Sequence, residues 1–227
     1  QRYSLSDVVT DRSRDNSDTI NLDMQTTEFL MDKILLNIEA ATADLLFTTG
    51  TWGLNATLNS ATAWRSPTTT SVPVQNILSA TSAIVSNSGR RPNTMILGYT
   101  SYDALKLNSD ITNRIQYVER AIANKEVMAS LFDIQTIHVG ESVRDSGTPG
   151  VSESLGYIWG PDALLCYLEK SPGMRKLSAA YMFQKSDVAT KKWRDEKVEG
   201  DYIEVNAMMR PYAVATACAY FFKAVAT

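Results

Sequence analysis

The chain has 227 residues, which is enough for one large domain or two small ones. Hydrophobic residues make up 44% of it and charged residues 21%, which is typical of folded proteins and excludes a disordered chain. The net charge of −3 argues against a strongly basic nucleic-acid-binding protein. The longest apolar stretch, 212–225, contains Lys223 and is too short to cross a bilayer, so we predict no membrane span.

The first elements along the chain are a polar segment and a long helix. Residues 1–22 carry many charges and few apolar anchors, which is typical of a free tail or of an arm that another subunit orders. Residues 23–47 have helical apolar spacing, and Asp23 is the expected N-cap. A helix of this length suggests a spine across which strands or other subunits lie. Its apolar stripe comprises Leu30, Ile34, Ile38, Ala41 and Leu45.

A connection rich in Thr, Ser and Asn follows over 48–72. We expect it to be irregular, and long irregular connections tend to be functional or interfacial. It contains Trp52 and Trp64, which could anchor it on its own domain or on a neighbour, because Trp is favoured at interface hot spots. Both interpretations remain open from the sequence.

The rest of the chain mixes short helices with strands. Ser101 and Ser109 are predicted helix N-caps, and Pro211 is predicted to end a strand that alternates over 203–208. Residues 213–222 are apolar enough for a strand that is covered on both faces. Because the order follows no strict βαβ rhythm, we predict an α+β fold. The other expected elements are helices at 73–87 and 127–132, strands at 94–98, 134–139, 155–159, 163–168 and 179–183, and a turn at 145–150.

The chain offers little for metal or thiol chemistry. His138 is the single histidine, and Cys166 and Cys218 cannot form a thiolate zinc site by themselves. Each cysteine lies in an apolar run, so we expect buried thiols, with a disulfide as the less favoured alternative.

Catalysis is also poorly supported. Phosphate-binding glycine loops are missing from the sequence. Ser142 would lie about 13 Å from His138 on an extended strand, too far to share a hydrogen bond; we expect His138 to be packed in a strand or to lie at a subunit contact. Asp145-Ser146-Gly147 occurs once, whereas an aspartic protease needs two carboxylates, so a local turn is the better interpretation. We predict no catalytic, cofactor-binding or metal-binding residue, and no cofactor.

Charges of both signs crowd the stretch 191–201. A solvated, self-neutralising hairpin or edge is the preferred interpretation, and a contact between copies in a lattice is its competitor. Together with the arm, the long helix and the Trp-bearing connection, this stretch favours a self-associating structural protein. Parts that extend from a compact body need partners to order them.

Several stretches, in their order and spacing, resemble the HK97-like major capsid proteins of tailed double-stranded DNA bacteriophages. The most specific one, 91–117, begins Arg91-Pro92-Asn93-Thr94-Met95-Ile96-Leu97-Gly98-Tyr99 and resembles a strand, turn and helix pair of the axial domain. Residues 23–47 are similar to the spine helix, 158–165 to a later axial-domain hairpin, and 197–201 to the lead-in of the long peripheral-domain strand. The resemblance covers roughly residues 20–227.

This resemblance implies a division of the chain. It places an N-terminal arm at 1–22, a peripheral domain at 23–70 and 172–210, and an axial domain with a central mixed sheet flanked by helices at 71–171 and 211–227. Relatives carry an extended loop that we expect before residue 1, where nothing here matches it. Since the chain begins with Gln1 rather than Met, we expect it to be processed, truncated or partly represented. We predict no covalent crosslink.

The resemblance also implies a function. The chain would be a structural subunit, not an enzyme, that self-assembles into hexamers and pentamers of an icosahedral or prolate shell. Its implied partners are identical subunits, portal and decoration proteins, and packaged double-stranded DNA touched non-specifically on the inner face, with no membrane. Its implied location is the virion, after assembly in the host cytoplasm. The alternative is an encapsulin-like bacterial nanocompartment with protein cargo, and a soluble hydrolase is a third class.

Overall fold

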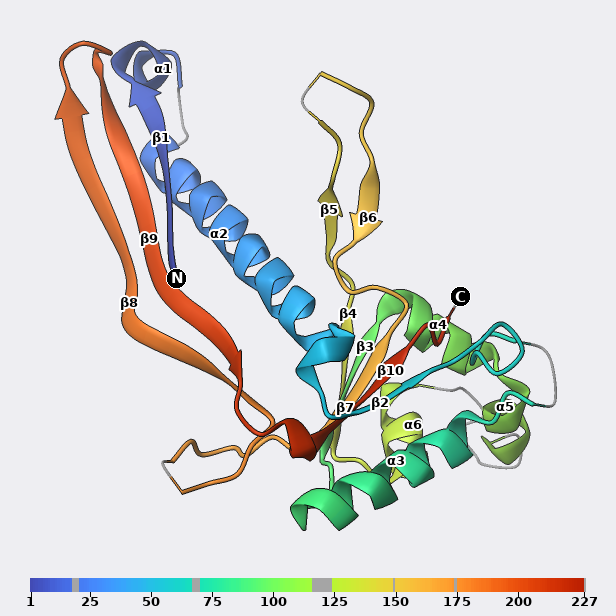
Figure 1. Cartoon of the computed structure of the whole chain (residues 1–227). Coiled ribbons are helices and arrows are strands. Elements are labelled where there is room, and N and C mark those ends of the chain that lie inside the picture. The colour runs from blue at the N-terminus through green and yellow to red at the C-terminus, as the bar shows by residue number, and fades with distance from the viewer. Residues whose placement is uncertain (18–20, 67–69, 116–123, 149, 174, 227) are drawn as a thin grey trace. The chain divides into compact units, whose positions relative to one another are not determined.

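The computed structural model describes residues 1–17, 21–66, 70–115, 124–148, 150–173 and 175–226. The chain divides into two compact units, which we call the three-stranded unit (Gln1–Thr42 and Met182–Tyr212) and the five-stranded unit (Ala43–Tyr181 and Ala213–Thr227). In chain order the elements are β1 (Arg2–Thr10), α1 (Asp11–Asp15), α2 (Leu22–Leu46), η1 (Thr49–Thr51), β2 (Leu54–Thr57), α3 (Pro73–Ser88), β3 (Thr94–Gly98), α4 (Tyr99–Leu107), α5 (Ser109–Ile115), α6 (Lys125–Phe132), β4 (Thr136–Gly140), β5 (Val143–Asp145), β6 (Leu155–Tyr157), β7 (Ala163–Cys166), β8 (Ala180–Asp195), β9 (Gly200–Ala213), η2 (Thr216–Cys218) and β10 (Ala219–Lys223) (Figure 1). The predicted α+β class is confirmed.

The three-stranded unit is one sheet covered on one face by one helix. Its strand order is β1-β9-β8, and β1 pairs antiparallel with β9 from Arg2↔Met208 to Thr10↔Gly200. The alternating apolar positions of β9 face the stripe of α2, as period-two alternation requires. The resulting core comprises Val9, Leu30, Ile34, Ile38, Ile203, Val205 and Ala207.

The first segment corrects one expectation. Residues 2–10 are neither a free tail nor an arm that another subunit orders, because they form β1 on their own chain's β9. Their apolar content was too low to predict this: Val9 is the buried residue of the strand. Backbone pairing along nine residues, rather than apolar burial, holds the strand in place.

Helix α2 spans Leu22–Leu46, which confirms the predicted long helix. Its N-cap is Asn21 rather than Asp23, because the Asn21 side chain accepts the Met24 N–H at 3.2 Å. Asp23 lies in the first turn, where a carboxylate favours the positive end of the helix dipole.

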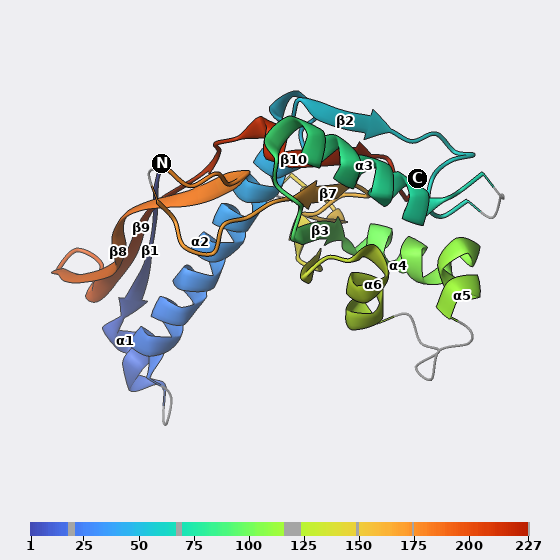
Figure 2. The ribbon, with the colours of Figure 1, turned by 90° about the horizontal axis from the view of Figure 1, so that it is seen from below.

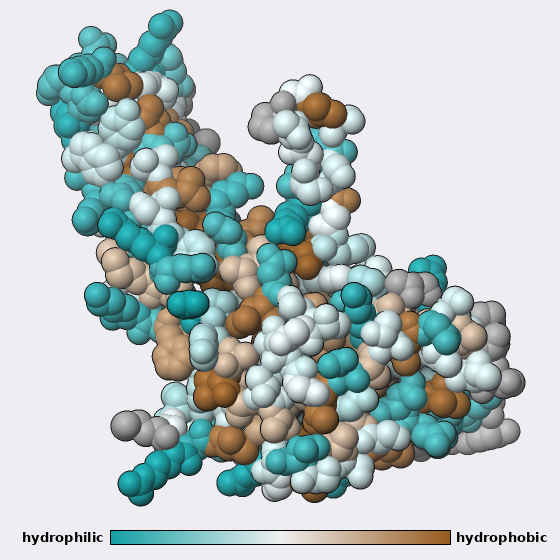
Figure 3. Space-filling view, viewed as in Figure 1, coloured by the Kyte–Doolittle hydropathy of each residue, from teal (hydrophilic) through white to brown (hydrophobic). Residues whose placement is uncertain are grey.

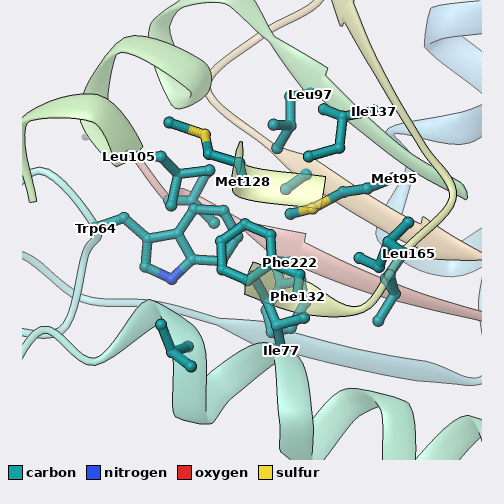
Figure 4. Close-up of a cluster of buried hydrophobic side chains, with 14 of the residues drawn as sticks. Trp64, Ile77, Met95, Leu97, Leu105, Met128, Phe132, Ile137, Leu165 and Phe222 are labelled. Atoms are coloured by element: carbon teal, nitrogen blue, oxygen red, sulfur yellow. The ribbon is translucent and has the colours of Figure 1, made fainter. Parts of the chain in front are cut away.

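The five-stranded unit is built on a mixed sheet of order β2-β10-β7-β3-β4. The β2–β10 and β3–β4 pairs are parallel, while β7 runs antiparallel to both β10 and β3. Helices α3, α4, α5 and α6 pack on one face of this sheet (Figure 2). Figure 4 shows the core between them, in which Trp64 and Phe222 lie among aliphatic and Met side chains. The labelled residues are Trp64, Ile77, Met95, Leu97, Leu105, Met128, Phe132, Ile137, Leu165 and Phe222.

The Thr-rich connection is more regular than predicted. It contains strand β2, which adds to the sheet beside β10. Trp64 is fully buried in the core of its own unit, and Trp52 donates its indole N–H to the Leu46 carbonyl at 2.7 Å. Both Trp residues therefore anchor their own chain, which settles the open alternative.

Two predicted N-caps are also wrong. Gly98 precedes α4, while Ser101 lies inside the helix and donates its hydroxyl to the Asp162 carbonyl. The side chain of Asn108, not Ser109, accepts the Asp110 N–H at the start of α5. A Cβ on Gly98 would come within 1.9 Å of the Gly160 carbonyl oxygen, so this close approach requires glycine.

The last strands differ from prediction in their ends. Strand β9 continues past Pro211 to Ala213, and a short 3-10 helix separates it from β10. Pairing with β1 ends at Met208, so the missing N–H of Pro211 breaks no bond to that strand. The strand predicted over 213–222 is therefore correct for 219–222 and wrong for 213–218.

The two compact units do not follow the bounds of the expected domains, and the expected domains stay a prediction. Residues 1–22 belong to the three-stranded unit, whereas 43–70 and 172–181 belong to the five-stranded unit. The reason for 43–70 is the pairing of β2 with β10 and the burial of Trp64.

Candidate assembly surfaces

The open face of the three-stranded sheet mixes polar side chains with Tyr202 and Met208. Arg2 donates to the side-chain carbonyl of Asn206 at 2.9 Å, and Ser4 hydrogen-bonds Glu204 on the same face.

Strand β8 is one of the two edge strands of this sheet, with β1 at the other edge, and most of its side chains are exposed. Trp193 is 44% exposed and stacks on Tyr202 with ring centroids 5.5 Å apart. An edge strand offers unpaired backbone groups to a further strand, and Lys residues at such an edge oppose unwanted pairing. Lys185, Lys191 and Lys192 lie along β8.

A cluster of charged side chains links residues 11–23 with residues 192–201 in this unit. Arg14 lies 2.8 Å from Asp23 and 2.7 Å from Asp201, and it also pairs with Asp11 at 3.2 Å. We call it the charge cluster; its members are Asp11, Arg14, Asp23, Lys192, Arg194 and Asp201. It ties α1 and the start of α2 to β8 and β9.

The cluster balances three cations with three carboxylates, and the pKa values reflect this. Hydrogen bonds from Lys192 and Arg14 hold the pKa of Asp23 and Asp201 below their ordinary value, and Arg194 does the same to the pKa of Asp11. The predicted self-neutralising edge at 191–201 is thus only partly correct. Lys192 and Arg194 find partners in the N-terminal segment, which sequence spacing could not reveal.

A groove of about 380 Å³ lies where β1 begins. Phe183, Met208 and Met209 supply its apolar lining, and its charged residues are Arg2, Lys185 and Arg210. We call it the cationic groove, because its lining contains no carboxylate.

The β5–β6 hairpin projects from the five-stranded unit with every strand residue exposed (Figures 1 and 3). Val143 pairs with Tyr157, and Asp145 with Leu155, so these side chains share one face. Val143 is 46% exposed, Tyr157 45% and Leu155 67%. Isolated two-stranded hairpins are marginally stable in water.

The residues that were considered for catalysis lie in ordinary structural settings. His138 is exposed on β4, at an edge of the five-stranded sheet, so the packed interpretation is wrong, while a subunit contact stays a prediction. The Asp145 carboxylate accepts the N–H groups of Gly147 and Ser154 and so fixes the hairpin loop, which confirms the predicted local turn. These bonds lower the pKa of Asp145.

Both cysteines are buried free thiols. Burial raises the pKa of Cys166 to about 12 and also raises the pKa of Cys218, so neither is a ready nucleophile. Among the described residues no group of His, Cys, Asp and Glu side chains is arranged to hold a metal ion. Within the same residues, no helix combines the length and apolar character that a membrane span needs.

The fold itself is the HK97-like capsid fold. Solved shell proteins match nearly the whole chain. The capsid protein of Myoviridae phage XM1 aligns with 98% of this chain and 72% of its own length, with a TM-score of 0.59 and 10% identity. A phage-related protein from Bordetella bronchiseptica RB50 aligns with 100% of this chain and 76% of its own length, with a TM-score of 0.86 and 20% identity.

One curated relative is similar in sequence. The major capsid protein of Burkholderia phage BcepMu is 25% identical over 158 residues, which cover 67% of this chain and 50% of the relative. The match thus spans about half the length of that protein. No family model matches the chain. An encapsulin from Synechococcus elongatus PCC 7942 also shares the fold, with a TM-score of 0.50 and 8% identity.

Proposed function

We propose that this chain is a structural subunit of a phage capsid, and that copies of it assemble into hexamers and pentamers of a closed shell. The observation that carries the proposal is its similarity to a phage major capsid protein in sequence, together with the capsid fold over nearly the whole chain. A shell subunit needs no active site, because its energy lies in many modest contacts repeated by symmetry.

The exposed parts of the chain support this proposal. Strand β8 and the β5–β6 hairpin expose both backbone edges and apolar side chains. Contiguous exposed apolar surface commonly marks an interaction site. In the proposal these parts are covered by identical copies.

The division into units suggests their places in a shell. The three-stranded unit, with its spine helix and long strands, corresponds to the peripheral domain, and the five-stranded unit to the axial domain near a local symmetry axis. Under this assignment the virion is the site of action, after assembly in the host cytoplasm. Portal and decoration proteins would be further partners, and packaged DNA would be touched only non-specifically on the inner face.

Electron microscopy of the expressed full-length subunit tests the proposal. We expect rings, shells or tubes built from repeated capsomers. Discrete monomers at all concentrations and salt conditions would contradict it. A monomer that also turned over an ester or peptide substrate would favour a soluble hydrolase.

The encapsulin match supports a second candidate, a nanocompartment shell with protein cargo. The contents of purified particles separate the two candidates. Nuclease-protected double-stranded DNA in particles from the natural source would favour the phage capsid, whereas a co-purifying protein cargo without DNA would favour the compartment.

A further inference from the structure

The β5–β6 hairpin and the cationic groove have complementary properties. One face of the hairpin carries the exposed side chains of Leu155 and Tyr157 beside Asp145, while the groove offers Phe183, Met208 and Met209. The groove volume of about 380 Å³ equals roughly a dozen waters at ~30 Å³ each, which is room for a pair of aliphatic side chains.

Their charges are also opposite. Residues 141–157 contain three carboxylates, Glu141, Asp145 and Glu153, against Arg144, a net charge of 1 − 3 = −2. The groove lining contains three cations and no carboxylate. Arg2 pairs with Glu204 at 3.6 Å, whereas Lys185 and Arg210 have no ion pair to a carboxylate in the described part of the chain. Complementary charges favour specific association and fix its register.

We propose that the β5–β6 hairpin of one copy docks in the cationic groove of a neighbouring copy, with Glu153 beside Lys185 or Arg210. The inference rests on the proposed function, since it names one contact of the shell. The contact is heterologous, because two different surfaces of the chain meet in it. Heterologous contacts close into rings when the rotation between copies allows it, as a capsomer requires.

Cross-linking between two single-cysteine variants tests the contact. Copies with Leu155→Cys and copies with Phe183→Cys carry different affinity tags, are co-expressed as full-length subunits, and are treated with a short bis-maleimide. The native Cys166 and Cys218 are buried and therefore react slowly. We expect cross-linked pairs that carry both tags, and such pairs can form only between copies.

The matched control replaces Leu155→Cys with Leu107→Cys. Leu107 is 73% exposed, so its reactivity is at least comparable, but it lies at the end of α4 and outside the hairpin. We expect little product from it. The charge test reverses the two cations that make no ion pair among the described residues, Lys185→Glu with Arg210→Glu, which should lower the yield about tenfold. Glu153→Lys in the other copy should restore part of the yield.

The outcomes separate this inference from the function. Particles that form normally while the Leu155–Phe183 yield stays at the Leu107 level would overturn the contact and leave the capsid proposal standing. Equal yields with and without the charge reversal would overturn the assigned partner charges. Discrete monomers without particles or cross-linked pairs would overturn both proposals.

Discussion

In the five-stranded unit four helices cover one face of the sheet, whereas in the three-stranded unit a single helix covers one face. The first core contains Trp64, Phe132 and Phe222 beside many aliphatic side chains; the second contains seven buried residues, none of them aromatic. Burial is worth roughly 25 cal/mol per Å² of apolar surface, so the larger core contributes far more stability. The three-stranded unit depends additionally on its charge cluster and, in our proposal, on neighbouring copies.

The largest expected effect comes from the core of the five-stranded unit. Trp64→Ala should cost about 3–5 kcal/mol of unfolding free energy, because it removes a fully buried aromatic side chain and leaves a cavity. Chemical denaturation of the subunit measures the loss. Trp193→Ala is the matched control, since Trp193 is 44% exposed, and it should cost about 1 kcal/mol or less. Equal losses would contradict the contrast between the units.

The next effect concerns the smaller core. Ile34 is 1% exposed between α2 and β9, so Ile34→Ala should cost about 2–4 kcal/mol. If the units open separately, hydrogen exchange should show reduced amide protection in β1 and β9 but unchanged protection in β3 and β7. The neighbouring Leu35→Ala, at a position 48% exposed, should leave exchange nearly unchanged. Uniform loss of protection across both sheets would show that the units unfold together.

The core of each unit could be predicted from apolar spacing, while several contacts could not. Leu30, Ile34 and Ile38 were predicted to face inward because they recur at helical spacing, and they are buried. Strand β1 was missed because its pairing uses backbone groups, which every residue type carries. Strand β2 was missed because Thr and Asn are frequent in loops as well.

The candidate surfaces show the same limit. The charges at 191–201 were recognised as a cluster, but their partners Asp11, Arg14 and Asp23 lie far away in the sequence. Nothing in local spacing specifies which distant charge an edge strand will meet. The hairpin loop was predicted because Gly and Pro mark turns, yet the face that Leu155 and Tyr157 share follows only from the register of β5 and β6.

A smaller effect should appear at acid pH, mainly in the three-stranded unit. The pKa values of Asp11, Asp23 and Asp201 lie below the ordinary 3.8, so their stabilisation is complete above that value and is lost as the pH falls through the folded-state pKa values. Protection factors in α1 and β8, corrected for the intrinsic pH dependence of amide exchange, should therefore fall as the pH drops below 3.8. Arg14→Met should weaken this pH dependence, and Arg12→Met, at an exposed position, should not. A pH dependence that is the same in all three proteins would contradict the role of the cluster.

The smallest effect is expected from helix capping. Asn21→Ala removes the side-chain acceptor of the Met24 N–H and should cost about 1 kcal/mol. Asn124→Ala removes the equivalent bond to Val127 in α6 of the other unit and should cost a similar amount. Thermal unfolding of both variants provides the comparison. A loss as large as that of Ile34→Ala would show that α2 depends on its cap rather than on its packing.

The most direct test of the account is hydrogen exchange along β8 in dissociated subunits and in assembled particles. Strand β8 lies at one edge of its sheet with most side chains exposed. We predict that its outward amides exchange rapidly in the subunit and become protected in the particle, while β3 and β7 stay protected in both. Equal exchange of β8 in the two states would contradict the claim that identical copies cover the exposed parts of the three-stranded unit.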